Sequence, residues 1–204
     1  LGAEKRYKLL KKKTNISLNL KFYPQNGSDN KAYQNVISNL KGPACAIIAV
    51  PDHLHYNIIK YCLKAGLHTL VVKPFTTKLN EAKDLIALSR KNNLYGAVEF
   101  HKRWDNQNLF AKNSLDNDSI GKLLYTIVEY SQKKSIPQKH FKSWAEKTNI
   151  FQYLGVHYVD LIHFITSAKP VRVMAVGQKN WLKKQSIDTF DSIQSFIEWE
   201  SSSF

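Results

Sequence analysis

Two side chains in this chain are candidates for proton transfer, Lys73 and His157. Lys73 stands before Pro74 and directly after an apolar run, which predicts a place at the carboxyl end of a strand, where open α/β sheets bind ligands. Tyr153, His157 and Asp160 follow the spacing i, i+4, i+7 in a predicted helix, so they form one polar stripe. Histidine titrates near neutral pH, and a lysine with a lowered pKa also exchanges protons, so both suit acid–base chemistry.

Each of these residues also has a structural interpretation. A lysine before a proline at a strand end is often only part of a loop, and a helical histidine is often a packed residue with satisfied hydrogen bonds. Asp160 either takes part in the chemistry, orients His157 or caps a neighbouring backbone group. His53, His68 and His163 are interpreted as surface or packing residues.

The elements that must position Lys73 form a strand–helix–strand unit. Ala44–Val50 is a continuous apolar run, as expected for a parallel strand buried on both faces. Asp52 is expected to cap the following helix, His55–Ala65, and Gly66 to end it. The next strand, Thr69–Val72, leads directly into Lys73, and a third short strand is expected at Tyr95–Phe100. The sequence therefore predicts a parallel β-α-β unit with the lysine at its ligand-binding edge.

The second half of the chain has a different pattern. It contains three candidate strands, the last two with the period-two alternation of a sheet with one covered face, and one strong helix. These elements are expected at Lys122–Tyr130, Val171–Gly177, Ser192–Glu200 and, for the helix, Ile150–Thr166. The fold class is therefore α/β in the first half and α+β, with a largely antiparallel sheet, in the second.

Composition excludes several classes of protein. The chain has 204 residues, 43% of them hydrophobic, and no apolar run approaches the roughly 18–20 residues of a membrane span. The formal net charge is +14, but the lysines are scattered without a nucleic-acid-binding motif, so no nucleic acid is expected as a partner. Cys45 and Cys62 fall in a predicted strand and a predicted helix, and are interpreted as reduced core residues of a cytoplasmic protein.

Several short motifs, taken in order and spacing, resemble the glucose–fructose oxidoreductase and inositol dehydrogenase (Gfo/Idh/MocA) family. They are VPDHLH at 50–55, AGLH at 65–68, VKP at 72–74, HKRW at 101–104, IGK at 120–122 and GVHYVD at 155–160. The resemblance implies a nicotinamide-binding Rossmann-type domain over residues 1–102. It also implies a substrate and oligomerisation domain over 103–204, α+β with an open, largely antiparallel sheet.

The same resemblance implies an activity. Hydride would pass between NAD or NADP and a hydroxyl- or keto-bearing carbon of a sugar, cyclitol or sugar nucleotide. Lys73 and His157 would transfer the proton, because oxidation of an alcohol requires removal of its hydroxyl proton. A cytoplasmic homodimer or homotetramer without a membrane contact is expected.

The resemblance also implies a set of binding residues. Substrate would contact Tyr153, Asp160 and Arg103. The cofactor would contact the loops that follow three strands, at Val50, Pro51, Asp52, His55, Lys73, Pro74 and His101. No metal site is expected.

The chain departs from the family pattern in three places. The glutamate that usually precedes the lysine is Val72, and the frequent aspartate four residues before the histidine is Tyr153. No GxGxxG loop is visible, and one interpretation makes Leu1-Gly2-Ala3 the end of such a loop. We expect the first domain to lack its N-terminal part and the second its C-terminal part. These departures leave an alternative open, a non-catalytic relative that binds a nucleotide or sugar as a sensor or subunit.

Overall fold

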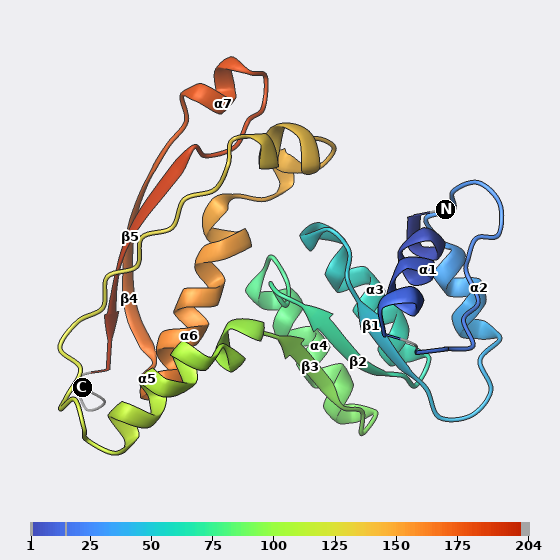
Figure 1. The fold of residues 1–204 in the computed structure, drawn as a ribbon, viewed down its shortest axis with the longest axis horizontal. Helices are drawn as coiled ribbons and strands as arrows, with labels where there is room; N and C mark the ends of the chain where they lie inside the picture. The colour runs from blue at the N-terminus through green and yellow to red at the C-terminus, as the bar shows by residue number, and fades with distance from the viewer. Residues whose placement is uncertain (1, 15, 201–204) are drawn as a thin grey trace. The chain divides into compact units, whose positions relative to one another are not determined.

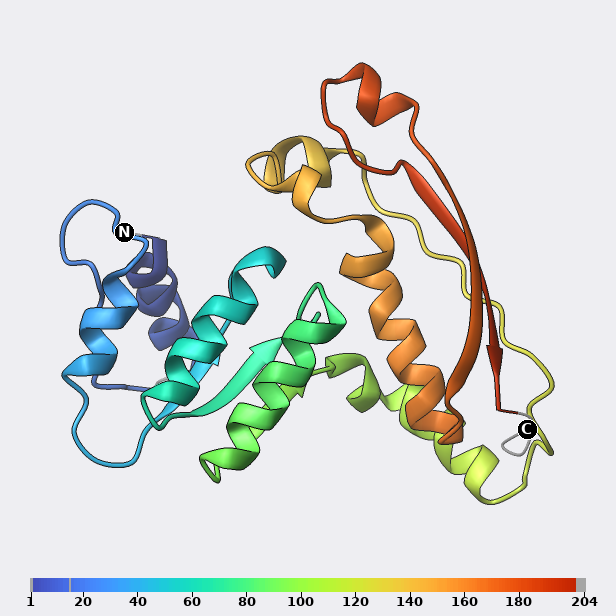
Figure 2. The same ribbon diagram turned by 180° about the vertical axis from the view of Figure 1, so that it is seen from behind.

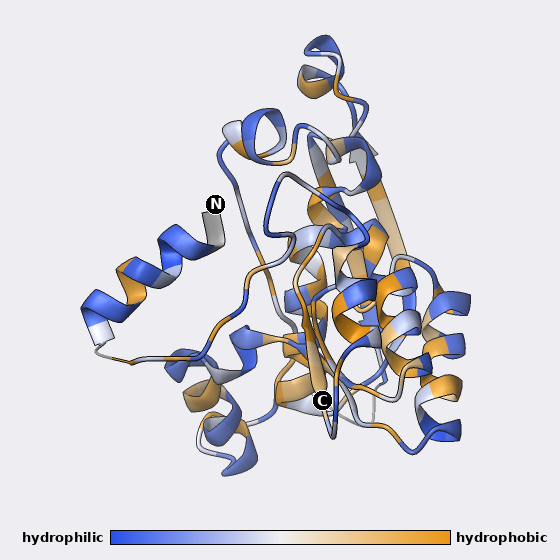
Figure 3. Ribbon diagram, turned by 90° about the vertical axis from the view of Figure 1, so that its right-hand side faces the viewer, coloured by the Kyte–Doolittle hydropathy of each residue, from blue (hydrophilic) through white to orange (hydrophobic). Residues whose placement is uncertain are grey.

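The structure is a computed structural model that describes residues 2–14 and 16–200. The chain divides into two compact units at Ala44–Cys45. The first unit contains helices α1 (Gly2–Thr14) and α2 (Ala32–Ser38), and α1, beside the N label in Figure 3, is mostly hydrophilic. The suggested loop end at Leu1-Gly2-Ala3 lies partly outside the described residues, because Leu1 is not among them. No helix in the described ranges is both long and apolar enough to cross a membrane.

The second unit begins with a three-stranded parallel sheet, as predicted. Its strands β1 (Cys45–Ile48), β2 (His68–Val72) and β3 (Gly96–Glu99) lie in the order β1-β2-β3. The connections are made by α3 (His55–Lys64) and α4 (Leu79–Lys91), which pack on each other and cover the same face of the sheet (Figures 1 and 2). This β-α-β-α-β arrangement carries the carboxyl ends of all three strands to one edge.

The core of this sheet lies between the strands and the two helices. Ile59, Leu63, Val71 and Leu85 are each 1% exposed. Ile47 on β1 is 74% exposed, so the prediction of a strand buried on both faces is wrong. Both crossover helices cover one face, and alternate strand residues point to the other.

The two cysteines differ for the same reason. Cys62 lies buried on α3, whereas Cys45 is exposed at the start of β1, and neither forms a disulfide. The core interpretation therefore holds for Cys62 only.

The ends of α3 were predicted with unequal success. At the C-terminus, Gly66 has φ +80°, its N–H donates to Leu63 O (3.2 Å) and the Leu67 N–H donates to Cys62 O (3.0 Å). These two bonds form a Schellman motif, which requires the left-handed conformation that glycine adopts readily. At the N-terminus the prediction is wrong, because Asp52 does not cap the helix. It begins a 3-10 turn, Asp52–Leu54, and its side chain is buried elsewhere.

The rest of the second unit combines helices with an antiparallel strand pair. After β3 come a 3-10 turn (His101–Trp104), α5 (Asn106–Asp116), a π turn (Ile136–His140), a 3-10 turn (Ala145–Lys147), a π turn (Phe151–Gly155), α6 (Val156–Thr166), β4 (Pro170–Gln178), α7 (Trp181–Lys184) and β5 (Ser192–Trp199). β4 and β5 pair antiparallel along their whole length, with a register shift between Pro170 and Arg172, which confirms the predicted pairing.

Two strand expectations in this half are wrong. Residues 122–130 form no strand, and in the described part of the chain no ladder includes them. Leu124 is 84% exposed and Ile127 is 74% exposed, so their local strand pattern finds neither a paired edge nor a covered face. β4 is also exposed at every position, so neither of its faces is covered.

Candidate active site

Lys73 lies where the sequence placed it, directly after β2 at the carboxyl edge of the parallel sheet. Its Nζ donates a hydrogen bond to the backbone carbonyl of Tyr153, and it lies 3.7 Å from the centroid of the Tyr153 ring. Burial lowers the pKa of the Lys73 amine, and the carboxylates of Asp52 and Glu99 oppose that shift. The structure therefore gives the lysine a partly desolvated site, with Tyr153 as its immediate partner.

His157 lies on α6, two residues from its start, and is 2% exposed. Its ring centroid is 4.6 Å from that of His101 and 6.1 Å from that of Phe100. Burial, together with the charge of Lys73, lowers the pKa of His157 to about 4. The ring is therefore neutral at physiological pH, and its buried Nδ1 has no hydrogen-bond partner among the described residues.

Tyr153 comes from the π turn that precedes α6, rather than from a regular α-helical turn. Single π turns occur often at functional sites, because they change the direction of side chains and carbonyls. The Tyr153 ring packs edge-on against Phe141, with centroids 4.7 Å apart, and burial raises the pKa of its hydroxyl. Tyr153 therefore contacts Lys73 directly, and the charge of Lys73 acts on His157, but Tyr153 and His157 do not continue one regular polar stripe.

Asp160 and Arg103 bind each other. The Arg103 Nε donates to Asp160 Oδ2 at 2.7 Å and its Nη2 donates to Oδ1 at 2.5 Å, a two-pronged contact between the 3-10 turn and α6. This contact raises the pKa of Arg103. The interpretation in which Asp160 orients His157 is wrong, because the carboxylate is turned to Arg103 and His157 Nδ1 has no partner in the described part of the chain.

His55 joins the two loops that flank the sheet edge. The residue is 0% exposed, its Nδ1 lies 2.6 Å from the carbonyl oxygen of Pro74, and its Nε2 lies 2.9 Å from that of Val50. Only a ring nitrogen that carries hydrogen donates, so a neutral ring donates to one of these carbonyls and a doubly protonated ring donates to both. The histidine therefore shapes the predicted cofactor loops, including Pro51, which follows Val50 directly.

Asp52, a predicted cofactor contact, faces the second half of the chain. Its Oδ2 accepts hydrogen bonds from Thr148 Oγ1 (2.8 Å) and Gln152 Nε2 (3.0 Å). His101, also predicted to contact cofactor, has an exposed side chain with Nδ1 3.0 Å from Glu99 Oε1. The structure thus brings Lys73, Tyr153, His157 and His101 together, whereas it uses Asp52 to tie the β1 loop to the segment before α6.

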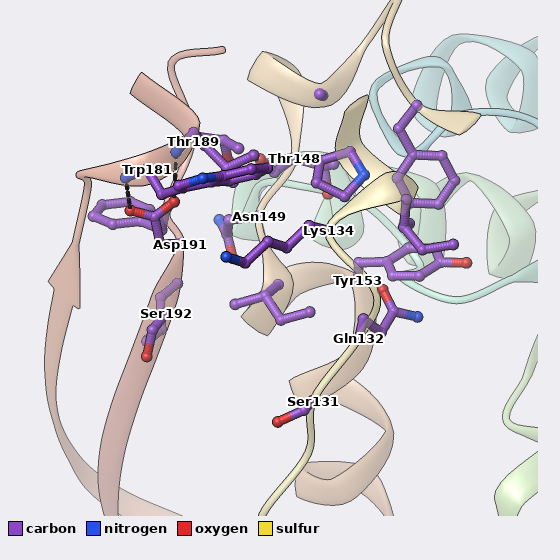
Figure 4. Close-up of a pocket in the computed structure, with 18 of the residues that line it drawn as sticks. Ser131, Gln132, Lys134, Thr148, Asn149, Tyr153, Trp181, Thr189, Asp191 and Ser192 are labelled. Carbon is purple, nitrogen blue, oxygen red and sulfur yellow. Dashed lines mark hydrogen bonds between the residues drawn. The ribbon is translucent and has the colours of Figure 1, made fainter. Parts of the chain in front are cut away.

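A cavity of about 510 Å³ adjoins Tyr153 (Figure 4). It lies between residues 130–153 and residues 178–193, and Lys73 and His157 are not among its lining residues. Its walls combine aromatic rings with amide, hydroxyl and ammonium groups, notably Gln132, Lys134, Asn149, Tyr153, Trp181 and Ser192. Sequence reasoning found only Tyr153 of these, because Gln132, Lys134 and Asn149 come from loops, and Trp181 and Ser192 stand at the starts of α7 and β5, where no periodic pattern marks them.

Trp181 and Lys134 are fixed on one wall of this cavity. The Asp191 carboxylate accepts backbone N–H bonds from Trp181 (2.8 Å), Leu182 (2.7 Å) and Asn180, which holds the start of α7 (Figure 4). The Lys134 Nζ lies 4.4 Å from the Trp181 ring centroid. The wall therefore presents an indole ring and an ammonium group. The Asp191 carboxylate, which accepts three backbone N–H bonds, holds the turn that carries Trp181.

The sheet edge fits the nicotinamide end of a dinucleotide. The carboxyl ends of three parallel strands converge there, Lys73 supplies an amine, and the buried His157 Nδ1 has no described partner. The sequence contains no GxGxxG loop to receive the pyrophosphate.

Two family models match successive parts of the chain. The one described as "Oxidoreductase family, NAD-binding Rossmann fold" covers residues 8–100, and the GFO/IDH/MocA C-terminal domain covers residues 109–203. The chain belongs to the Gfo/Idh/MocA oxidoreductase family. The suspected family, the NAD-binding Rossmann fold of the first part and the antiparallel strands of the second are thereby confirmed.

Individual relatives agree with this assignment. The chain is 26% identical to the scyllo-inositol 2-dehydrogenase (NADP(+)) of Bacillus subtilis over 159 residues, which are 76% of this chain and 43% of that protein. The crystal structure of myo-inositol 2-dehydrogenase from Lactobacillus plantarum matches with TM-score 0.73 and 22% identity, covering 95% of this chain and 56% of that one.

A second structure, scyllo-inositol dehydrogenase from Lactobacillus casei with bound NAD(H) and scyllo-inositol, matches with TM-score 0.66 and 19% identity. It covers 84% of this chain and 51% of that one. At these identities the structural matches show the fold. The chain spans about half the length of these relatives.

Proposed function

We propose that the protein is an NAD(P)-dependent oxidoreductase that acts on a hydroxyl- or keto-bearing carbon of a sugar, cyclitol or sugar nucleotide. The observation that carries the proposal is the position of Lys73, a partly desolvated amine at the carboxyl edge of a parallel sheet, which contacts Tyr153 and whose charge adds to the burial that lowers the pKa of His157. Inositol dehydrogenases among the relatives and the NAD-binding family model support the substrate class and the cofactor.

The bound nicotinamide supplies or accepts the hydride. In the oxidation direction Lys73 Nζ would accept the proton of the substrate hydroxyl, and the O–H electron pair would form the new C=O bond as the C–H pair departs as the hydride that a bound NAD(P)⁺ would take up. A lowered pKa favours the neutral amine that this step requires. His157, neutral and with an unpartnered Nδ1, accepts a hydrogen bond from a substrate hydroxyl.

The cavity beside Tyr153 receives the body of the substrate. Aromatic rings with amide and hydroxyl groups suit a polyol, whose C–H faces pack on rings while its hydroxyls find donors and acceptors. The Tyr153 hydroxyl binds substrate there. Arg103 and Asp160 would contact substrate as an ion pair, because each side chain already binds the other.

The domain organisation is part of the proposal. We place the boundary of the cofactor domain at residues 102/103, and we assign the protein as a homodimer or homotetramer. Exposed apolar residues along β4 support the assembly, since Val171, Val173 and Val176 are 59%, 61% and 71% exposed.

The test uses the full-length protein. Calorimetry measures binding of NADH and NADPH, and turnover is measured on a panel of cyclitols, sugars and sugar nucleotides for wild type, Lys73→Ala and Lys83→Ala. Removing a proton-transfer group lowers turnover by about 10²–10⁴-fold, so Lys73→Ala is expected to lose activity but still bind cofactor. Lys83, exposed on α4, is the matched control and is expected to retain activity.

Two results would overturn the proposal. If the protein bound neither NADH nor NADPH, the dehydrogenase hypothesis would be rejected and the hypothesis of a non-catalytic relative would be favoured. If Lys73→Ala kept full turnover, Lys73 would not be the proton-transfer group.

A further inference from the structure

Tyr153 meets the Lys73 amine twice. The backbone carbonyl accepts a hydrogen bond from Nζ, and the ring lies under the same nitrogen at 3.7 Å from its centroid. An ammonium group over an aromatic face is attracted by the ring quadrupole. The two contacts come from one residue that lies 80 positions along the chain.

Carboxylates near this amine are directed to other partners. Asp52 accepts from Thr148 and Gln152, and Glu99 contacts His101. The residue before the lysine is Val72, which carries no charge. Among the described residues Lys73 therefore takes part in no ion pair.

This arrangement has a chemical consequence. A carboxylate within about 4–6 Å stabilises an ammonium group strongly and commonly moves a pKa by about 1–3 units. An aromatic ring and a carbonyl also hold the nitrogen in place. They favour the protonated amine over the neutral amine less strongly than a carboxylate does.

We propose that Tyr153 is the positioning residue of Lys73, and that it holds the amine through its ring and its carbonyl in place of a carboxylate. The proposal rests on the function proposed above. Tyr153 also lines the substrate cavity, so one residue joins the substrate compartment to the amine that takes the proton.

Three substitutions separate the contributions of Tyr153. Tyr153→Phe keeps the ring under Nζ and removes the hydroxyl, Tyr153→Leu removes the ring, and Tyr153→Asp introduces a carboxylate. The backbone carbonyl remains in all three. Tyr125→Asp is the matched control, because Tyr125 is 74% exposed and, in the described part of the chain, the Lys73 amine contacts Tyr153 instead.

The first measurement reports the lysine itself. An NMR titration of the full-length protein with isotope-labelled lysine follows the Lys73 signal, which Lys73→Arg assigns. Tyr153→Asp is expected to raise the pKa of Lys73 by about one unit or more, whereas Tyr153→Phe and Tyr125→Asp leave it in place. An unchanged Lys73 titration in Tyr153→Asp would overturn the proposal.

The second measurement is the pH profile of turnover in the oxidation direction. Tyr153→Asp is expected to move the acidic limb of the profile to higher pH by the same amount, while Tyr153→Phe raises KM and leaves the limb in place. Tyr153→Leu is expected to lower kcat about 10–100-fold, because a displaced amine loses its alignment. Equal kcat in Tyr153→Leu and wild type would also overturn the proposal.

The two measurements distinguish the underlying hypotheses. If the wild-type protein binds no cofactor and turns over no substrate, the proposed function fails, yet the NMR titration still decides whether Tyr153 controls Lys73. Thermal unfolding of each variant identifies any that does not fold, and Tyr153→Phe, the mildest change, keeps the comparison available.

Discussion

The contact between Arg103 and Asp160 predicts a measurable coupling energy. Two charge-assisted hydrogen bonds of 2.7 and 2.5 Å join the side chains, which are 32% and 11% exposed. Exposed pairs contribute about 0–1 kcal/mol, whereas breaking a buried pair costs about 3–5 kcal/mol because a charge is left unpaired. This pair lies between those cases, so we expect a coupling of about 2 kcal/mol.

A double-mutant cycle measures that coupling. Urea unfolding of wild type, Arg103→Met, Asp160→Asn and the double variant gives the pairwise term. Arg103→Met is expected to lower the free energy of unfolding by about 3 kcal/mol, since it leaves the Asp160 carboxylate nearly buried and alone. The double variant is expected to recover part of that loss, because neither charge remains.

A matched control comes from β4 and β5. Arg172 and Glu198 also form an ion pair, but their side chains are 71% and 47% exposed, so the same cycle should give about 0.5 kcal/mol. If the Arg103–Asp160 coupling were no larger than this control value, the pair would not hold the 3-10 turn against α6. Arg103 would then be free to bind substrate directly.

Two further perturbations test the interior of the site. Asp52→Ala removes the acceptor for Thr148 and Gln152. Hydrogen bonds to a charged group contribute about 1.5–3 kcal/mol each, so urea unfolding should show a free energy of unfolding lower by about 3 kcal/mol. A loss below about 0.5 kcal/mol would contradict this expectation. The pKa of His157 is lowered from 6.5 to about 4, so between these values the unfolded chain binds the proton more tightly than the folded one. The stabilising effect of a neutral His157 should be complete above pH 6.5 and disappear as pH falls towards 4, and His157→Gln should remove this pH dependence; a His157 NMR titration near 6.5 would refute it.

Local sequence patterns predicted the elements that depend on local interactions. The apolar runs before Pro51 and Lys73 became β1 and β2, and Gly66 ended α3 in a Schellman motif. Residues 122–130 show the limit of such patterns, because their alternation is that of a strand and yet no neighbour pairs with them. A strand requires a partner edge, and a single sequence does not say where that edge lies.

The sequence named the candidate residues of the site, but it did not predict their contacts. Spacing alone placed Tyr153, His157 and Asp160 on one helical stripe, and the π turn at 151–155 interrupts that regular spacing. In the structure each member has a different neighbour: Tyr153 holds Lys73, His157 packs on His101, and Asp160 binds Arg103. Pairs separated by 56 to 80 residues leave no periodic signal in a sequence.

The VPDHLH segment positions other residues of the candidate site through the side chains of His55 and Asp52. His55 lies between the carbonyls of Val50 and Pro74, and so fixes the loop that contains Lys73 relative to the end of β1. Asp52 fixes the same segment to Thr148 and Gln152, one residue before Tyr153. Lys73 and Tyr153 are thus each anchored to one short turn, which sets the distance between the amine and the ring. His55 and Asp52, which the family resemblance assigns to cofactor binding, therefore also fix the position of Lys73 relative to Tyr153.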